Sequence, residues 1–532
     1  MYAYLENELR ESVVFVIDTE ATTAGNKQTQ NPVHALLNTH SAYSTLEDVT
    51  IDWGDGTTTN IPKGTHYSDT YIDTYATHTY TTPGKYTVTV YVDSMHNCRI
   101  FNKASFSLFR GTLISIGPED AESYSLPVMD EPFSDAFQFC KKLKRIPKGL
   151  FDKNVDAVYF HRCFQYCTSL TEIPEDIFAK TIAARSFEGV FKNCGGITVI
   201  PSGLFDKCPD VTSFQSTFAY TSITECPANL FDNCPNVSTF ERLFEGCHEL
   251  TAIPMGIFDK HPKVTTFDNT FSNCQSLTAV PDGLFDNCPL VTNFDGVFLS
   301  CSAITHFPTD IFANNLEVTT FNDAFRNCLS WSDPMPSTMF SKHTKVTTVA
   351  HLFDNCRNLT GSIPGNLLSV MTELVDVEYL FESCYKLTGI IPAELFANNP
   401  KITDFSYVFS DCIQLTGIPE GLFDNQPDAA VFFATFSGCQ SIVGEIPANL
   451  FAKNTKVTDF GSVFAGLSKM THIPEDIFAN NIKATNFYNA FFRVVGWCGD
   501  SRRTVQKPAG CHIFPEYVRE LAGFKEYPVR VV

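Results

Sequence analysis

A short motif recurs along most of this chain at a nearly constant interval. The stretch from Leu277 to Thr305, LTAVPDGLFDNCPLVTNFDGVFLSCSAIT, is a representative unit. Its proline recurs every 26 to 28 residues, and the thirteen occurrences are Pro147, Pro174, Pro201, Pro227, Pro254, Pro281, Pro308, Pro336, Pro364, Pro392, Pro419, Pro447 and Pro474. A fixed period of this size predicts a solenoid, in which each unit completes the apolar core of its neighbour. Such an architecture typically serves recognition of partners rather than catalysis.

Each unit consists of two similar halves. The first runs from Leu277 to Cys288, and the second, from Val291 to Cys301, repeats its order of Leu/Val-Thr, Phe and Cys. The Leu/Val-Thr segments favour short β-strands because they are rich in β-branched and aromatic residues. The residues between strand and Cys are too few for more than one or two helical turns. We therefore expect a mainly β fold with short helical turns and two narrow parallel ladders along the solenoid.

The first 114 residues lack the repeat and carry strand and hairpin patterns. We expect strands over residues 12–18 and 49–53, the second of which ends at an Asp-Gly turn. The segment from His78 to Val92 contains a Pro-Gly turn followed by an alternating strand. Short strands separated by such turns predict a β-sandwich. The expected organisation is a sandwich over 1–114, a solenoid of about 13 coils over 115–494 and a C-terminal cap over 495–532.

The N-terminal motifs also resemble those of a known family. Trp53-Gly-Asp-Gly56, His78-Thr-Tyr80 and the segment from Pro83 to Val90 are similar to the signature of the PKD domain. PKD domains are immunoglobulin-like sandwiches common in extracellular proteins. The resemblance implies a spacer or binding module without catalytic activity.

The repeat region resembles the bacterial leucine-rich repeats of the BspA-like kind. In both, an aromatic residue, a Cys, a Leu and an Ile-Pro recur in that order, and here the pattern extends from Phe133 to Phe491. The related repeats of mycoplasma surface lipoproteins are similar as well. The resemblance implies a surface protein that binds host components.

The 19 cysteines are distributed mainly in two columns. The first comprises Cys140, Cys167, Cys194, Cys247, Cys274, Cys301, Cys328, Cys356, Cys384, Cys412 and Cys439. In the second, Cys208, Cys234 and Cys288 alternate with Asn154, His261, Asn315, His343, Asn399, Asn454 and Asn481. This interchange predicts buried free thiols at positions where a small polar side chain bonds the turn backbone. Disulfides and metal binding are the alternatives, and Cys498 could pair with Cys511 in an oxidising compartment.

Charge and motif content exclude several classes of function. The net charge of −21 argues against nucleic acid, which requires clustered Lys and Arg. One basic cluster exists, and we interpret it as the capping surface of the first coil or as a docking contact; its members are Lys141, Lys142, Lys144, Arg145 and Lys148. No apolar run reaches the length of a membrane span, so we expect no membrane insertion.

Catalytic and cofactor motifs are missing from the sequence. It contains no GxSxG elbow, HExxH, phosphate-binding loop or dinucleotide fingerprint, so we expect no enzyme activity. Asp52 and Asp55 could contribute to a Ca²⁺ site, although the Asp-Gly turn already accounts for Asp55. No other cofactor is expected.

The best binding candidates in the sequence are threonines that recur in register. Thr265, Thr292, Thr319 and Thr347 follow the first apolar residue of successive half-units. On a parallel ladder they would form a flat hydrogen-bonding surface. The competing interpretation is that Thr merely suits exposed strand positions.

Three hypotheses for function follow from these features. The start of the sequence has no secretory leader, and a phage particle escapes by lysis, so we expect a structural protein of a bacteriophage virion that displays the solenoid for binding to a host surface. Its partners would be other virion proteins and a host protein or glycan, with a further copy of the chain left open. The alternatives are a bacterial cell-surface adhesin and the accessory binding region of a glycan-active enzyme.

Overall fold

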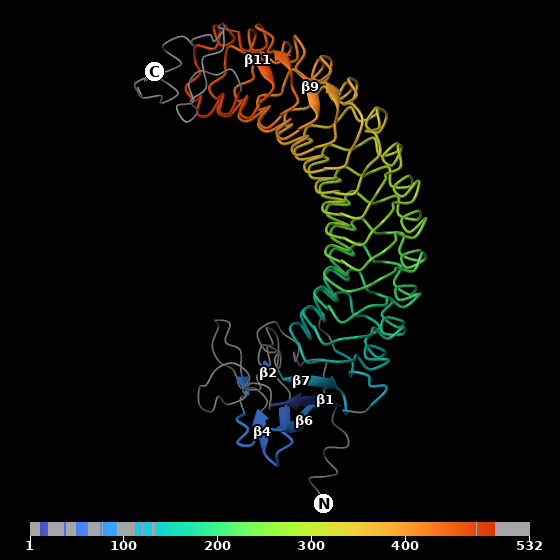
Figure 1. Cartoon of the computed structure of the whole chain (residues 1–532). Helices are drawn as coiled ribbons and strands as arrows, with labels where there is room; N and C mark the ends of the chain where they lie inside the picture. The colour runs from blue at the N-terminus through green and yellow to red at the C-terminus, as the bar shows by residue number, and fades with distance from the viewer. Residues whose placement is uncertain are drawn as a thin grey trace, which may run out of the picture. The chain divides into compact units, whose positions relative to one another are not determined.

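The structure divides the chain into two compact units. The computed structural model describes residues 11–19, 37–38, 49–61, 75–76, 78–92, 112–119, 121–129, 133–474 and 476–494 (Figure 1). Unit 1 is Met1–Lys263 and unit 2 is Val264–Val532. The described chain is mostly non-helical and contains few strands, and none of the described residues lies in a helix.

The N-terminal part of unit 1 contains one five-stranded antiparallel sheet. The strand order is β4-β3-β6-β1-β7, with bounds Thr58–Ile61, Val49–Asp52, Lys85–Val92, Glu11–Asp18 and Leu113–Ile116. The short strands β2 (Leu37–Asn38) and β5 (Tyr75–Ala76) pair separately. The strands expected at 12–18, at 49–53 and after the Pro-Gly turn of 78–92 are present as β1, β3 and β6, and the ends of β1 and β3 differ by one residue from the prediction. Strand β7 extends the sheet two residues beyond the predicted boundary at 114. A complete immunoglobulin-like sandwich remains a prediction.

Both units contain stacked coils built around a recurring eight-residue segment, which we call the turn segment. Its pattern is Phe-x-x-x-Phe-x-x-Cys, with positions numbered 1 to 8. The turn segments begin at residues 133, 160, 187, 214 and 240 in unit 1, and at 267, 294, 321, 349, 377, 405, 432, 460 and 487 in unit 2. Positions 1, 4, 5 and 8 are buried in nearly every coil, which explains their uniform apolar character.

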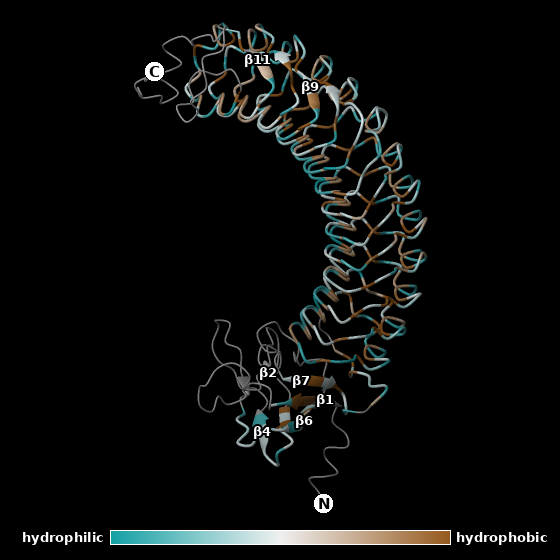
Figure 2. Ribbon diagram, viewed as in Figure 1, coloured by the Kyte–Doolittle hydropathy of each residue, from teal (hydrophilic) through white to brown (hydrophobic). Residues whose placement is uncertain are grey.

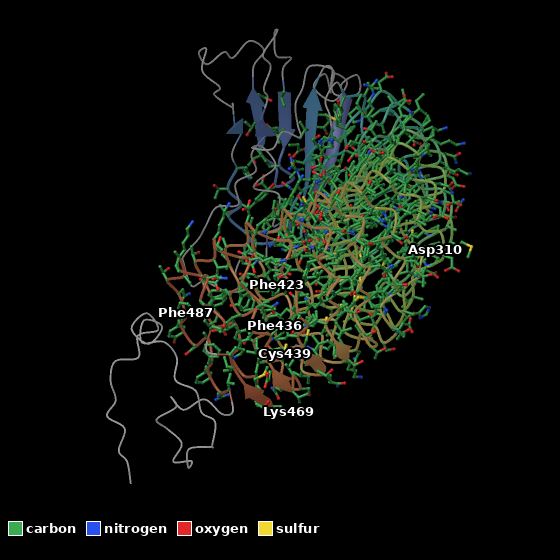
Figure 3. The ribbon with its side chains drawn as sticks, turned by 90° about the horizontal axis from the view of Figure 1, so that it is seen from above. Asp310, Phe423, Phe436, Cys439, Lys469 and Phe487 are labelled. Carbon is green, nitrogen blue, oxygen red and sulfur yellow. The ribbon has the colours of Figure 1, made fainter. Side chains whose placement is uncertain are left out.

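The core of each stack consists of columns of phenylalanine rings. Phe294 and Phe321 lie 5.9 Å apart and within 4° of parallel, which is typical of the column at position 1. A second column occupies position 5, and a third is formed by the Phe of the Gly-Leu-Phe motif. Phe423 of the third column contacts Phe436 of the second at 6.1 Å, and both rings are fully buried (Figure 3). Figure 2 shows the resulting alternation of apolar and polar segments along each coil.

The two expected parallel ladders are present, mostly as single bridges rather than strands. In unit 2 the first ladder joins Thr266 to Asn293, then to Thr320 and Thr348. The second includes the only regular strands in the described part of this unit, which pair as β8 (Gly389–Ile390) with β9 (Leu415–Gly417) and β10 (Gly444–Glu445) with β11 (Met470–His472). The regular strands of the second ladder contain two or three residues each, whereas a single bridge uses one residue per coil.

The short helical turns expected after the strands do not form. The Gly-Leu-Phe segment makes isolated turns instead, with bonds from the Asp286 amide to Gly283 (3.0 Å) and from the Cys288 amide to Phe285 (3.0 Å). Gly283 has a φ of 67°, a left-handed conformation that interrupts helical geometry. Our prediction of short helical turns was therefore wrong for the described coils.

The turn segments form a third ladder that we did not predict. Along each turn segment, successive amides alternate between two kinds of acceptor. The amides of Asp323, Phe325 and Asn327 donate to backbone carbonyls of the next coil, which contains Leu352, and the amides between them donate to the carbonyl three residues back in the same coil. Positions 3 and 7 are left-handed in every turn segment. Every described non-glycine residue with positive φ lies at one of these two positions. The chain therefore adopts a costly conformation twice per coil in order to direct amides at the neighbouring coil.

Candidate binding surface

The structure places the four candidate threonines in one exposed column of unit 2. Thr292 donates its hydroxyl to the carbonyl of Thr265 (3.2 Å), Thr319 to Thr292 (3.1 Å) and Thr347 to Thr319 (3.2 Å). Each of these carbonyls also accepts the backbone amide of the same donor residue at 2.9 Å. The hydroxyl hydrogens thus join successive coils, and the column presents mainly acceptor oxygens to a ligand.

A second surface differs from this column because its side chains vary from coil to coil. It consists of positions 2, 3, 6 and 7 of the turn segments, which we call the turn face. These positions hold acids, bases, aromatics and glycine, whereas positions 1, 5 and 8 are Phe, Phe and Cys in most coils. Most of the side chains at these positions are partly exposed. Stacking therefore leaves these four positions free to serve recognition, and in repeat proteins one such face commonly binds the partner.

Four aromatic side chains form a continuous strip on the turn face of unit 2. We call His351, Tyr379, Tyr407 and Phe433 the aromatic strip. His351 and Tyr379 stack at 4.3 Å and 11°, Tyr379 and Tyr407 stack at 4.5 Å and 10°, and Phe433 follows at 5.3 Å and 59°. The first two spacings are shorter than the 5.8 Å that separates Phe353 from Phe381, and Phe381 from Phe409, in the core of the same coils. Both ring faces of Tyr379 are covered by its neighbours.

Glycine makes room for the end of the strip. A Cβ atom at Gly461, in the coil after Phe433, would lie 2.8 Å from the Phe433 ring and 2.9 Å from Asn486. These distances are shorter than side chains tolerate, so the ring rests on the glycine backbone. The backbone of Gly461 is held by Asp459, whose carboxylate accepts its amide at 2.7 Å.

Three carboxyl groups flank the two tyrosines, and we call them the open carboxyl groups. They belong to Glu378, Glu382 and Asp411. Within the described parts of the chain, no residue donates a side-chain hydrogen bond to them or forms an ion pair with them. By contrast, Asp376 and Asp404 on the adjacent ladder each accept a backbone amide two residues ahead, at 3.1 and 2.8 Å, and so have a structural role.

Burial and mutual repulsion raise the pKa values of the open carboxyl groups. Burial, followed by the nearby charge of Asp354, raises the pKa of Glu382 to about 7. Burial and the charges of two neighbouring aspartates raise the pKa of Glu378, and burial raises that of Asp411. Burial is the largest cause for all three groups, and nearby carboxylates add to it for Glu378 and Glu382, whereas a bound cation would lower these pKa values.

At two other places on the turn face, arginine pairs with aspartate. Arg326 lies 3.1 Å from Asp323 and 2.9 Å from the nearly buried Asp354, which also contacts Nδ1 of His351 at 2.9 Å. In unit 1, Arg162 donates to both carboxylate oxygens of Asp135, at 2.8 and 3.3 Å. The coils of Tyr379 and Tyr407 have no such arginine on their turn faces.

The candidate Ca²⁺ ligands in the N-terminal sheet are engaged in their own turn. Asp52 accepts the amide of Gly54 at 2.9 Å, and Asp55 accepts the amide and hydroxyl of Thr57 at 3.0 and 2.6 Å. The second oxygen of Asp55 contacts Nε2 of His78 at 2.7 Å. The described residues assemble no group of three or more metal-ligating side chains, so the hairpin turn accounts for both aspartates there.

The structure supports the predicted roles of the cysteines that it describes. These sixteen cysteines are buried and form no disulfide bond with one another, and burial raises the pKa of several of them, for example to about 12 for Cys194 and about 11 for Cys208. In the second column, Asn315 donates to the carbonyls of Phe285 (3.0 Å) and Cys288 (2.9 Å), as expected for a turn-bonding position. Cys498 and Cys511, with the predicted cap at 495–532, lie outside the described residues.

The basic cluster of the first coil makes contacts inside unit 1. Lys142 donates to the carbonyl of Asp18 at 3.4 Å, and Arg145 donates to that of Glu119 at 2.6 Å. Both acceptors flank strands of the N-terminal sheet. These two side chains therefore join the first coil to the sheet, which agrees with a capping role for this part of the cluster.

Comparison with known proteins adds little to this description. No family model and no curated protein matches the chain. A solved structure of the Toll–Spätzle complex from Drosophila is similar over 61% of this chain, with 16% identity and a TM-score of 0.33. The match spans 46% of that chain, less than half of its length. No helix of the described residues is long and apolar enough to cross a membrane.

Proposed function

We propose that this chain is a non-catalytic recognition protein that binds a protein or glycan on a cell surface through the turn face of its leucine-rich-repeat-like coils. The supporting observation is the contrast between constant and variable positions of the turn segment. Core positions repeat Phe and Cys, whereas the turn face of unit 2 contains a stacked aromatic strip. Nothing in the packing of the stack requires His351, Tyr379 and Tyr407 at these places, since other coils have Gly, Ser or Asn there.

The proposed location is the bacteriophage virion, with other virion proteins as attachment partners. The same surface would serve a bacterial adhesin or the accessory region of a glycan-active enzyme, so the location is tested separately. Mass spectrometry of purified phage particles and of bacterial envelope fractions should find the protein in the particles. Recovery from the envelope alone would favour the adhesin.

Binding is tested with the fluorescently labelled full chain on a panel of intact gut bacteria. The double variant Tyr379→Ser/Tyr407→Ser should lose most cell binding because it removes the two central rings of the strip. It should preserve the stack, since Ser216 and Ser462 occupy the equivalent position in other coils. A triple variant with Thr265, Thr292 and Thr319 changed to Lys should bind nearly as well as the wild type. If the threonine variant alone loses binding, the Thr column is the recognition surface and the turn face is not.

A further inference from the structure

We propose that the aromatic strip and the open carboxyl groups form a docking surface for an arginine-rich peptide segment of the partner. This inference rests on the proposed function and names the chemistry of its ligand. The occupant would be an extended chain whose guanidinium groups pair with Glu378, Glu382 and Asp411. Its aliphatic stems would lie along the edges of Tyr379 and Tyr407.

The first argument is that the turn face already contains arginine–carboxylate pairs at two other places. Arg162 pairs with Asp135 through two hydrogen bonds, and Arg326 bridges Asp323 and Asp354 of successive coils. Guanidinium is well suited to this role because its planar fork matches a carboxylate in two-point geometry. The open carboxyl groups occupy the same face without such a partner. The structure thus contains two filled examples of the interaction and one unfilled site.

The second argument is that the nearby bases are already engaged. Arg326 is held by its two aspartates, and Arg357 donates to the Asn355 side chain at 2.6 Å while lying 5.4 Å from the Tyr385 ring. The charge of Arg326 reaches Glu382, but in the described part of the chain neither base forms an ion pair with any of the three carboxyl groups. Their compensation therefore has to come from a ligand, from solution ions or from protons.

The third argument concerns the aromatic rings and excludes a competing ligand. A sugar that stacks on an aromatic side chain needs an open ring face, and so does a cation above a ring. The faces of Tyr379 are covered at 4.3 Å by His351 and at 4.5 Å by Tyr407. The strip therefore presents ring edges. The aliphatic stems of the peptide's arginines would pack beside these edges, and their guanidinium groups would reach the carboxylates. No group of three or more metal-ligating side chains lies among the described residues, so a bare metal ion is disfavoured as well.

The test uses the full chain and two synthetic peptides. In the first peptide arginines are separated by Gly-Ser pairs, and in the second each arginine is replaced by citrulline, which keeps the shape and removes the charge. Maltohexaose is the neutral sugar probe. Affinities are measured by isothermal titration calorimetry at low and high NaCl, because exposed charge pairs weaken as salt screens them.

The variant is Glu378→Gln/Glu382→Gln, and the matched control is Glu373→Gln. Glu373 pairs with Lys401 at 2.5 Å and lies outside the turn face, so the control removes an exposed carboxylate of the same type. We expect the arginine peptide to bind the wild type and the control equally, and the double variant at least about tenfold more weakly, as expected for loss of charge-assisted bonds. The citrulline peptide should bind more weakly by a similar factor. Thermal unfolding of all three proteins confirms that the fold is intact.

The outcomes separate this inference from the proposed function. Any one of three results overturns the arginine-peptide assignment. The citrulline peptide binds as tightly as the arginine peptide, the double variant binds the arginine peptide as tightly as the wild type does, or maltohexaose binds and the arginine peptide does not. If cells are bound as well by the double variant as by the wild type, the inference fails while the recognition role stands. If the wild type binds no cell in the panel, the proposed function fails independently of the peptide result.

Discussion

Single polar residues in the second column replace one another because each performs the same hydrogen-bonding task. Asn315 and Asn399 donate to two carbonyls of the preceding coil, and His343 donates to one. Cys234 places its thiol 3.4 Å from one such carbonyl and 3.6 Å from another. Side chains of different size thus meet one requirement, which is to satisfy backbone acceptors buried inside a tight turn.

Removing one of these donors should destabilise the stack measurably. We expect Asn315→Ala to lower the free energy of unfolding by about 2 kcal/mol, because two buried hydrogen bonds are lost. Asn315→Cys should cost less, since Cys fills the equivalent position in other coils. Chemical denaturation provides the measurement, and the exposed neighbour Asn314→Ala is the control. An equal loss in the two alanine variants would contradict the assigned role.

The two histidines of this column should make the protein sensitive to acid. Burial lowers the pKa values of His261 and His343 from the ordinary 6.5. The unfolded chain then binds more protons than the folded chain as the pH falls below 6.5, so stability is lost in acid. We expect His261→Asn/His343→Asn to reduce the loss of melting temperature between pH 7.5 and pH 5. An unchanged loss would show that other groups dominate.

Glu382 should act in the opposite direction. Its pKa is raised from 4.5 to about 7, so the folded state holds the proton more tightly and stability falls as the pH rises through this interval. We expect Glu382→Gln to be more stable than the wild type at pH 8 and to lose this advantage at pH 4.5. The melting temperatures of the two proteins across this range measure the difference. The effect should be modest because solvent screens this half-buried group.

At the scale of the coil, the left-handed residues determine how turn segments stack. Asn is the residue most tolerant of this conformation after glycine, and it occurs at position 7 in Asn273, Asn327 and Asn355. Tyr379 and Tyr407 adopt the same conformation without that tolerance. Phe139, Tyr166 and Tyr220 do the same in unit 1, so the turn segment accepts bulky residues at these positions.

A substitution at one strained position tests this account of the turn segment. Ser383 has a φ of 57°, and its amide donates to Ser410 of the next coil. We expect Ser383→Gly to be neutral or slightly stabilising, and Ser383→Val to cost about 1–2 kcal/mol, because a β-branched residue disfavours left-handed geometry. The exposed Lys386→Val is the control, and urea denaturation is the measurement. If both valine variants lose the same stability, backbone strain is not the cause.

The sequence predicted the period and the core of the coil but not its recognition surface. Repeated Phe, Cys and Pro identified the stacked units, and the exchange of Cys with Asn and His identified the turn-bonding column. The left-handed ladder had no signal at the level of residue type, since Tyr379, Asp323 and Ala434 all adopt positive φ. The aromatic strip was not predicted, because its residues lie at positions that vary from coil to coil, whereas the prediction relied on threonines that recur in register. The variable residues between Phe and Cys were the available clue.

At the scale of the whole molecule, the stack should tolerate changes in its number of coils. The inter-coil hydrogen bonds of unit 2 join residues of adjacent coils, so removing whole coils leaves each remaining contact type intact. We expect deletion of Asp282 to Pro336 to give a folded, shorter protein by circular dichroism and size-exclusion chromatography. Deletion of Asp282 to Asp295 removes about half a coil and should unfold or aggregate the protein, because it displaces the Phe columns. Equal behaviour of the two deletions would contradict the repeat model.

The third ladder also gives each stack an electrical polarity. In each turn segment, alternate amides donate to the following coil, as the amide of His351 does to Glu378 and that of Tyr379 does to Ser406. The amides of the threonine ladder donate to the preceding coil and are fewer. Peptide dipoles aligned in this way add together, as they do along a helix. Their positive pole lies toward the later coils and their negative pole toward the earlier ones. The backbone of such a stack therefore has a net dipole along the stack, and its two ends attract ions of opposite sign independently of the side chains.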